Sequence, residues 1–93
     1  MYRIIDSRGS GKTSRLMLLA KENDSAIACS NPAAMRQKAY AYGITGIDFI
    51  SYNDLIDGWE GDVFIDELEV FVKYFLGLGY DTKVKGYTLS NED

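Results

Sequence analysis

Asp6-Ser7-Arg8-Gly9-Ser10-Gly11-Lys12-Thr13 is the stretch that decides the fold, because it joins two segments with different hydrophobic patterns. Residues 2–5 before it are short and apolar, as in a strand, and residues 13–23 after it have helical spacing. A sharp turn from a strand into a helix aims several backbone N–H groups at one point, and glycines let an anion approach them closely. The stretch therefore predicts a phosphate-binding loop.

Part of this stretch follows the nucleotide-binding pattern G-x-x-x-x-G-K-[ST], with Gly11, Lys12 and Thr13 at its end and Asp6 in place of the first glycine. In this pattern the lysine reaches the β- and γ-phosphates, and the threonine hydroxyl binds the Mg²⁺ that bridges them. Aspartate tolerates a left-handed backbone, so we expect Asp6 to be a variation at the base of the loop. The alternative is a plain glycine-rich turn. The residues predicted to bind the phosphates are Arg8, Gly9, Ser10, Gly11, Lys12, Thr13 and Ser14.

A second motif is the apolar segment 62–65 followed by the acids Asp66 and Glu67. Beside the loop, Asp66 would hold Mg²⁺ together with Thr13, and Glu67 would act as the catalytic base that orients or deprotonates a water. Lys12 would assist catalysis at the phosphates. The alternative is a buried strand followed by an acidic helix start, since acids suit helix N-termini. The presence of both motifs favours the nucleotide site.

The whole chain alternates strands with helices, which predicts an α/β fold: a mostly parallel sheet of about five short strands with helices in layers on it. Strands are expected at residues 2–5, 26–29, 47–50, 62–66 and 83–90. Helices are expected from 13 to 23, from 32 to before 43, as a single turn within 51–58, and from 67 to 77. No linker or repeat interrupts this order, so residues 1–93 are predicted to be one domain.

Several residues mark the expected ends and faces of these helices. Asn31 is a suitable N-cap with Pro32 at the first helical position, and Gly43 suits a left-handed C-terminus. In the last helix, an apolar spacing of i, i+3, i+4 and i+7 predicts one buried face. The residues of that face are Leu68, Phe71, Val72 and Phe75.

Composition excludes some kinds of chemistry. The chain has no histidine, which excludes histidine acid–base catalysis and histidine metal ligands. The one cysteine, Cys29, excludes an internal disulfide and is expected to be a small buried side chain. No segment has the pattern of a signal peptide or membrane span, so a cytoplasmic protein is expected.

Charge is unevenly distributed along the chain. Residues 1–40 have a net charge of +4, and residues 41–93 have a net charge of −8. A basic half that carries a phosphate loop is electrostatically reasonable. The overall acidity argues against non-specific coating of nucleic acid, although a local contact with DNA stays open.

At its two motifs the sequence resembles the P-loop NTPases, in particular the branch with a catalytic glutamate after the Walker B aspartate, which includes RecA-like, AAA+, helicase and terminase ATPases. Residues 8–13 resemble the phosphate loop of phage terminase large subunits, and the whole chain is similar to small P-loop proteins of bacteriophages. The resemblance implies ATP or GTP with Mg²⁺ as ligand. It also implies a central strand whose tip carries a polar sensor, for which Ser90 and Asn91 are the candidates; the alternative is a frayed edge segment.

Two functions follow from these features. The first is a weak ATPase that needs a protein partner or self-assembly for full activity, because no arginine finger can be assigned beyond the candidates Arg15 and Arg36. The second is a non-hydrolysing P-loop module that acts by binding a host or phage protein, or DNA. A nucleotide kinase is disfavoured, since arginines that would clamp a second substrate's phosphates are not apparent.

Overall fold

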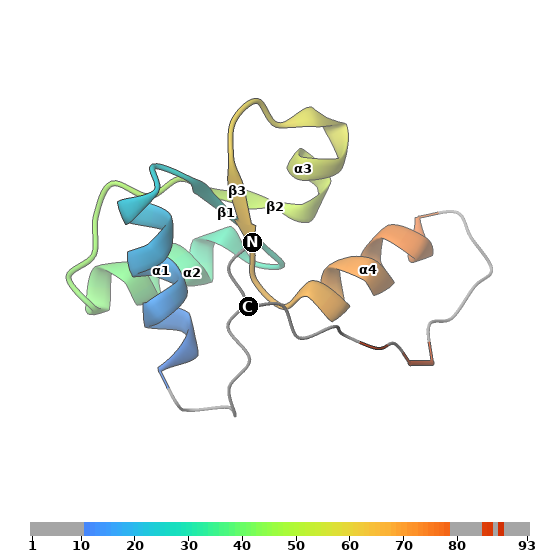
Figure 1. Ribbon diagram of the computed structural model, residues 1–93, viewed down its shortest axis with the longest axis horizontal. Coiled ribbons are helices and arrows are strands. Elements are labelled where there is room, and N and C mark those ends of the chain that lie inside the picture. The colour runs from blue at the N-terminus through green and yellow to red at the C-terminus, as the bar shows by residue number, and fades with distance from the viewer. Residues whose placement is uncertain (1–10, 79–84, 87, 89–93) are drawn as a thin grey trace.

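The computed structural model describes residues 11–78, 85, 86 and 88. Within them, four helices alternate with three strands (Figure 1). In chain order these elements are α1 (Lys12–Glu22), β1 (Ala26–Cys29), α2 (Pro32–Ala41), β2 (Phe49–Ser51), α3 (Tyr52–Gly58), β3 (Val63–Ile65) and α4 (Leu68–Gly77). The predicted α/β class is confirmed.

The three strands form one parallel sheet in the order β2-β1-β3, with β1 in the middle. The prediction of about five strands is wrong for the described residues, which contain three. Lys85, Gly86 and Thr88 lie in no strand, and a glycine without a side chain to pack weakens a strand at this point. The rest of the expected strand at 83–90, and the one at 2–5, lie outside the described residues.

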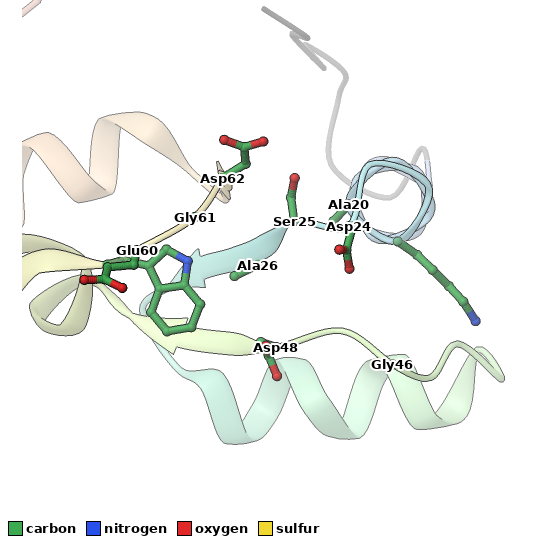
Figure 2. A pocket seen from close by; sticks show the side chains of 11 residues that line it. Ala20, Asp24, Ser25, Ala26, Gly46, Asp48, Glu60, Gly61 and Asp62 are labelled. Atoms are coloured by element: carbon green, nitrogen blue, oxygen red, sulfur yellow. The ribbon is translucent and has the colours of Figure 1, made fainter.

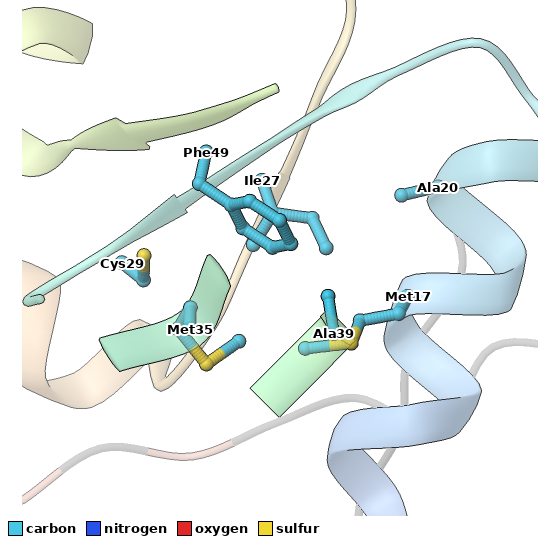
Figure 3. Packing of buried hydrophobic residues seen from close by; sticks show 7 residues of the cluster. All are labelled: Met17, Ala20, Ile27, Cys29, Met35, Ala39 and Phe49. Carbon is cyan, nitrogen blue, oxygen red and sulfur yellow. The ribbon is translucent and has the colours of Figure 1, made fainter. Parts of the chain in front are cut away.

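Alternation along the strands gives the sheet two apolar faces, which helices cover. Ile27 pairs in register with Phe49 and Phe64, and this face packs against α1 and α2. The core on this side is fully or nearly fully buried (Figure 3). Its members are Met17, Ala20, Ile27, Cys29, Met35, Ala39 and Phe49.

The opposite face of the sheet is smaller and packs against α3 and the start of α4. Ala28, Ile50 and Tyr52 are its buried members, and Phe71 of α4 packs against them from outside. The sheet is therefore the middle layer, with α1 and α2 on one side and α3 on the other.

Helix caps form as the sequence predicts. The Asn31 side chain accepts a hydrogen bond from the Ala34 N–H, with Pro32 in the first turn. Gly43 has a φ of 74°, the left-handed conformation expected after this helix. Ser51 and Asp54 form a reciprocal capping box at α3, which runs longer than the single turn expected.

The predicted buried face of α4 is wrong. None of the described residues of this helix is buried, and Leu68 and Phe75 are 53% and 42% exposed. The physical reason is the position of α4, which starts beyond the end of β3 and extends away from the sheet (Figure 1). Helical spacing predicts an apolar stripe but not what lies opposite it.

The first two helices differ in charge from the last two. The sequences of α1 and α2 contain five basic side chains and one acid. Those of α3 and α4 contain three acids and one base. No helix in the described part of the chain is long and apolar enough to span a membrane.

Candidate functional site

The two predicted motifs meet at the carboxyl end of β3. Lys12, the first residue of α1, donates from Nζ to Oε1 of Glu67, which follows β3, at a distance of 3.1 Å. Their side chains are 28% and 43% exposed, so water screens the attraction and the pair adds only about 0–1 kcal/mol of stability. The pair therefore matters chiefly because it joins residues that are 55 positions apart in sequence.

The start of α1 has the features of an anion site. Gly11, its N-cap, has a φ of 82° and no side chain that could cap the helix. The first backbone hydrogen bond of the helix runs from the Arg15 N–H to the Gly11 carbonyl, and the Ser14 hydroxyl donates to the same carbonyl. The first turn contains no acid. The N–H groups before Arg15 have no partner inside the helix, and the helix dipole favours an anion in front of them.

Gly11 is needed for its backbone conformation rather than for space. A Cβ at this position would lie 3.7 Å from the Ser14 Oγ, an ordinary contact distance. The positive φ, however, is one that L-residues rarely adopt. The sequence predicted another role for Gly11, the close approach of an anion to a backbone without a Cβ, and that role stays a prediction.

The turn between β3 and α4 holds the two acids. The Asp66 N–H donates to the Ala28 carbonyl at 2.9 Å, which continues the pairing of β3 with β1 by one residue. Glu67 then takes a φ of 57° and a ψ of 69°, a left-handed conformation that costs a non-glycine residue about 1–3 kcal/mol. Such strain is typical of residues whose side chain must point in one particular direction.

The electrostatic surroundings of Asp66 favour a cation. Burial, followed by the neighbouring Glu67 carboxylate, raises the pKa of Asp66 above its ordinary value, while Lys12 and Lys38 act in the opposite direction. A carboxylate in this position is short of positive charge, which a divalent ion would supply. No group of three His, Cys, Asp or Glu side chains able to hold a metal occurs among the residues that the structure describes. Magnesium commonly binds one or two carboxylates plus substrate phosphates and water, so the donor set fits Mg²⁺ with nucleotide.

Cys29 ends β1 and Tyr52 directly follows β2, so both lie at the carboxyl ends of the strands, but they are not reactive groups. Burial raises the pKa of the Cys29 thiol to about 11, and the Asp66 carboxylate adds to this effect. Burial likewise raises the pKa of Tyr52 to about 12. Both groups are therefore neutral at ordinary pH, and the expectation that Cys29 is a buried small side chain is confirmed.

The described residues include only part of the predicted site. Lys12 and Glu67 are brought together, Thr13 and Ser14 lie half-buried in the first turn of α1, and Asp66 precedes Glu67. Arg15 and Arg36 are exposed helix residues. The other predicted residues, Arg8, Gly9, Ser10, Ser90 and Asn91, lie outside the described residues, as does Asp6.

Tyr52 is a residue that the sequence did not single out. Its hydroxyl donates to the Asp66 carbonyl at 2.6 Å and makes a longer contact of 3.4 Å with the Glu67 carbonyl. The available signal was its position directly after β2, because the carboxyl ends of parallel strands meet at one edge of a sheet.

A hollow of about 230 Å³ lies at the opposite edge, where the strands begin (Figure 2). Its lining includes Trp59 and four acids, Asp24, Asp48, Glu60 and Asp62. These acids repel phosphate, and ligands of parallel α/β sheets bind at the carboxyl ends instead. The hollow is therefore a poor candidate for a nucleotide site.

Comparison of the chain with protein-family models, curated proteins and solved structures gave no match. A functional proposal therefore rests on the two motifs and on the geometry that joins them.

Proposed function

We propose that this chain binds a nucleoside triphosphate with Mg²⁺ at the carboxyl edge of its sheet and hydrolyses it slowly. The observation that carries this proposal is the 3.1 Å pair between Lys12 and Glu67. A phosphate-binding lysine and a water-activating carboxylate must lie within a few ångströms of the same phosphate. In the folded chain these two side chains are direct neighbours, although each comes from a separate motif.

Each residue of the site would have a distinct task. The N–H groups at the start of α1 would bind phosphate oxygens, as would the Lys12 ammonium. Thr13 and Asp66 would hold Mg²⁺, which neutralises phosphate charge during transfer. When phosphate binds, the Lys12 ammonium would pair with it and leave Glu67. The Glu67 carboxylate, no longer paired with Lys12, would then accept a proton from the attacking water.

A slow rate is part of the proposal. The described site contains one lysine in direct contact with the candidate base, and rapid hydrolysis commonly needs a further arginine. We expect a partner protein or a second copy of the chain to supply that charge. A stimulated rate at high protein concentration would identify the second copy as the source.

The direct test is a calorimetric titration with ATP and Mg²⁺, followed by a phosphate-release assay on the same sample. Lys12→Ala should weaken nucleotide binding by about 10- to 100-fold, as expected for loss of charged hydrogen bonds. Glu67→Gln should retain binding and lose about 10²- to 10⁴-fold in turnover. Lys21→Ala and Glu22→Gln are matched controls at exposed positions near the other end of α1. Unchanged turnover in Glu67→Gln would reject its catalytic role, and an absence of binding by the unaltered chain would reject the whole proposal.

A second candidate is a non-hydrolysing module that binds another protein. The observation that favours it is a group of exposed apolar side chains on α4 and on the residue that follows this helix. These are Leu68, Val70, Tyr74, Phe75 and Leu78. Nucleotide binding without phosphate release, in the presence and absence of other proteins, would favour this module over the ATPase.

A further inference from the structure

Tyr52 is a buried aromatic residue whose hydroxyl reaches the turn that carries the two acids. The residue is 3% exposed, and it is the first residue of α3, directly after β2. The hydroxyl donates to the Asp66 carbonyl at 2.6 Å. The carbonyl of Glu67 lies 3.4 Å from the same hydroxyl and also accepts from the N–H groups of Val70 and Phe71.

This hydrogen bond holds the peptide between Asp66 and Glu67 in one orientation. The Asp66 N–H is already bonded to Ala28 of the central strand, so the residue is held through its N–H on one side and its carbonyl on the other. A flip of the peptide would change the φ of Glu67 from its left-handed value to a negative one, which a glutamate prefers. The bonds at the Glu67 Cα would adjust to the new φ, and even a small shift of its Cβ would move the carboxylate that now contacts Lys12.

The tyrosine ring provides a rigid support for this bond. It packs edge-on against Phe71 with ring centroids 5.2 Å apart, and lies 5.8 Å from the ring of Tyr74. A buried ring held by neighbours keeps its hydroxyl in a fixed place. The hydroxyl therefore acts on the turn from outside the β3–α4 segment itself.

We propose that Tyr52 is the positioning residue of the site, which holds the Asp66–Glu67 peptide so that the Glu67 carboxylate faces Lys12 and the phosphate position. Tyr52 itself does not reach the reacting atoms. Its effect on hydrolysis rests on the proposed function, whereas its effect on the geometry of the turn does not.

The test uses Tyr52→Phe, which keeps the ring and removes the hydroxyl. Its matched control is Tyr74→Phe in the same aromatic cluster, whose lost hydroxyl donates to Asn53 rather than to the acids. Both variants should fold, as checked by circular dichroism. Two readouts are then compared with the unaltered chain: the NMR signals of the Asp66 and Glu67 amides without nucleotide, and the kcat and Kd for ATP with Mg²⁺.

We expect Tyr52→Phe to shift both amide signals and to lower kcat by about 10- to 100-fold with an unchanged Kd, since small misplacements of a reacting group have effects of this size. Tyr74→Phe should leave all of these quantities unchanged. Amide signals that respond equally to both substitutions would overturn the proposal, as would a kcat that Tyr52→Phe leaves intact. If the unaltered chain does not hydrolyse ATP, the proposed function fails, and the amide signals alone decide whether Tyr52 holds the turn.

Discussion

Lys12 and Glu67 form an ion pair of 3.1 Å across the carboxyl edge of a three-stranded parallel sheet. The pair joins the start of α1 to the turn after β3, the two places where the sequence has its phosphate-binding and acidic motifs. Under the proposed function, the carboxylate of Glu67 contacts the same Lys12 ammonium that a phosphate oxygen would contact. The proposal therefore implies that the two anions compete for one ammonium group.

This competition predicts that Glu67→Gln binds nucleotide more tightly than the unaltered chain. An exposed ion pair contributes at most about 1 kcal/mol, so the gain in affinity should be up to about fivefold. Calorimetry at constant ionic strength measures it, with Glu22→Gln as the control for a change of net charge. Weaker binding by Glu67→Gln than by this control would contradict the competition.

The left-handed backbone of Glu67 predicts a difference in stability between two truncations. Glu67→Gly and Glu67→Ala both remove the carboxylate, but glycine also relieves the strain at a φ of 57°. We expect the glycine variant to be more stable than the alanine variant by about 1 kcal/mol. Urea unfolding of the two proteins gives the comparison directly. Equal stabilities would mean that this residue is not held left-handed in solution.

The raised pKa of the Cys29 thiol predicts that the protein loses stability at alkaline pH. Burial raises the pKa of this thiol from 9.0 to about 11 in the folded chain. The unfolded chain therefore releases the proton first, so the free energy of unfolding should fall as pH rises from about 9 to about 11, by about 3 kcal/mol in all. Below pH 9 this group should make no pH-dependent contribution.

The matching experiment follows urea unfolding against pH for the unaltered chain and for Cys29→Ala. The alanine variant loses packing at all pH values but should lack the additional fall above pH 9. Tyr52, whose pKa is raised to about 12, contributes a fall above pH 10 in both proteins. The interval from 9 to 10 therefore isolates the thiol, and parallel curves there would refute this assignment.

The capping box of α3 predicts that the protein becomes less stable when the hydroxyl of Ser51 is removed. The Ser51 Oγ accepts from the Asp54 N–H, and the Asp54 side chain accepts from the Ser51 N–H. Ser51→Ala should lower the free energy of unfolding by about 1 kcal/mol. Ser30→Ala is the control, because Ser30 is an exposed serine at the corresponding junction after β1. A similar loss in both variants would exclude capping as the cause.

Local signals in the sequence were sufficient to predict the helices and strands that have distinctive ends. Asn31, Pro32 and Gly43 mark α2 by side-chain and backbone preferences that operate within a few residues, and β1 is a compact apolar run. The prediction that one face of α4 is buried failed for the opposite reason. Its apolar spacing is a property of the helix alone, whereas burial depends on the distance between the helix and the sheet.

The site was predictable to the extent that topology determines it. Parallel strands place their carboxyl ends at one edge, so motifs expected to follow strands are expected to meet there. Lys12 and Glu67 are in contact, although the strand expected before Lys12 lies outside the described residues. The contribution of Tyr52 depends on a hydroxyl–carbonyl contact between segments 14 residues apart, which no local pattern encodes. The positive φ of Glu67 has no sequence signal either, since glutamate rarely adopts it.

The basic side chains of α1 and α2 and the acidic ones of α3 and α4 make the electric field uneven around the described part of the molecule. A polyanion that diffuses toward the chain is turned by this field toward the side of α1 and α2 before it makes any contact. Added salt screens such long-range forces, with a Debye length of about 8 Å at physiological ionic strength. The proposed capture of a nucleotide at the start of α1 should therefore slow with ionic strength far more than its release does.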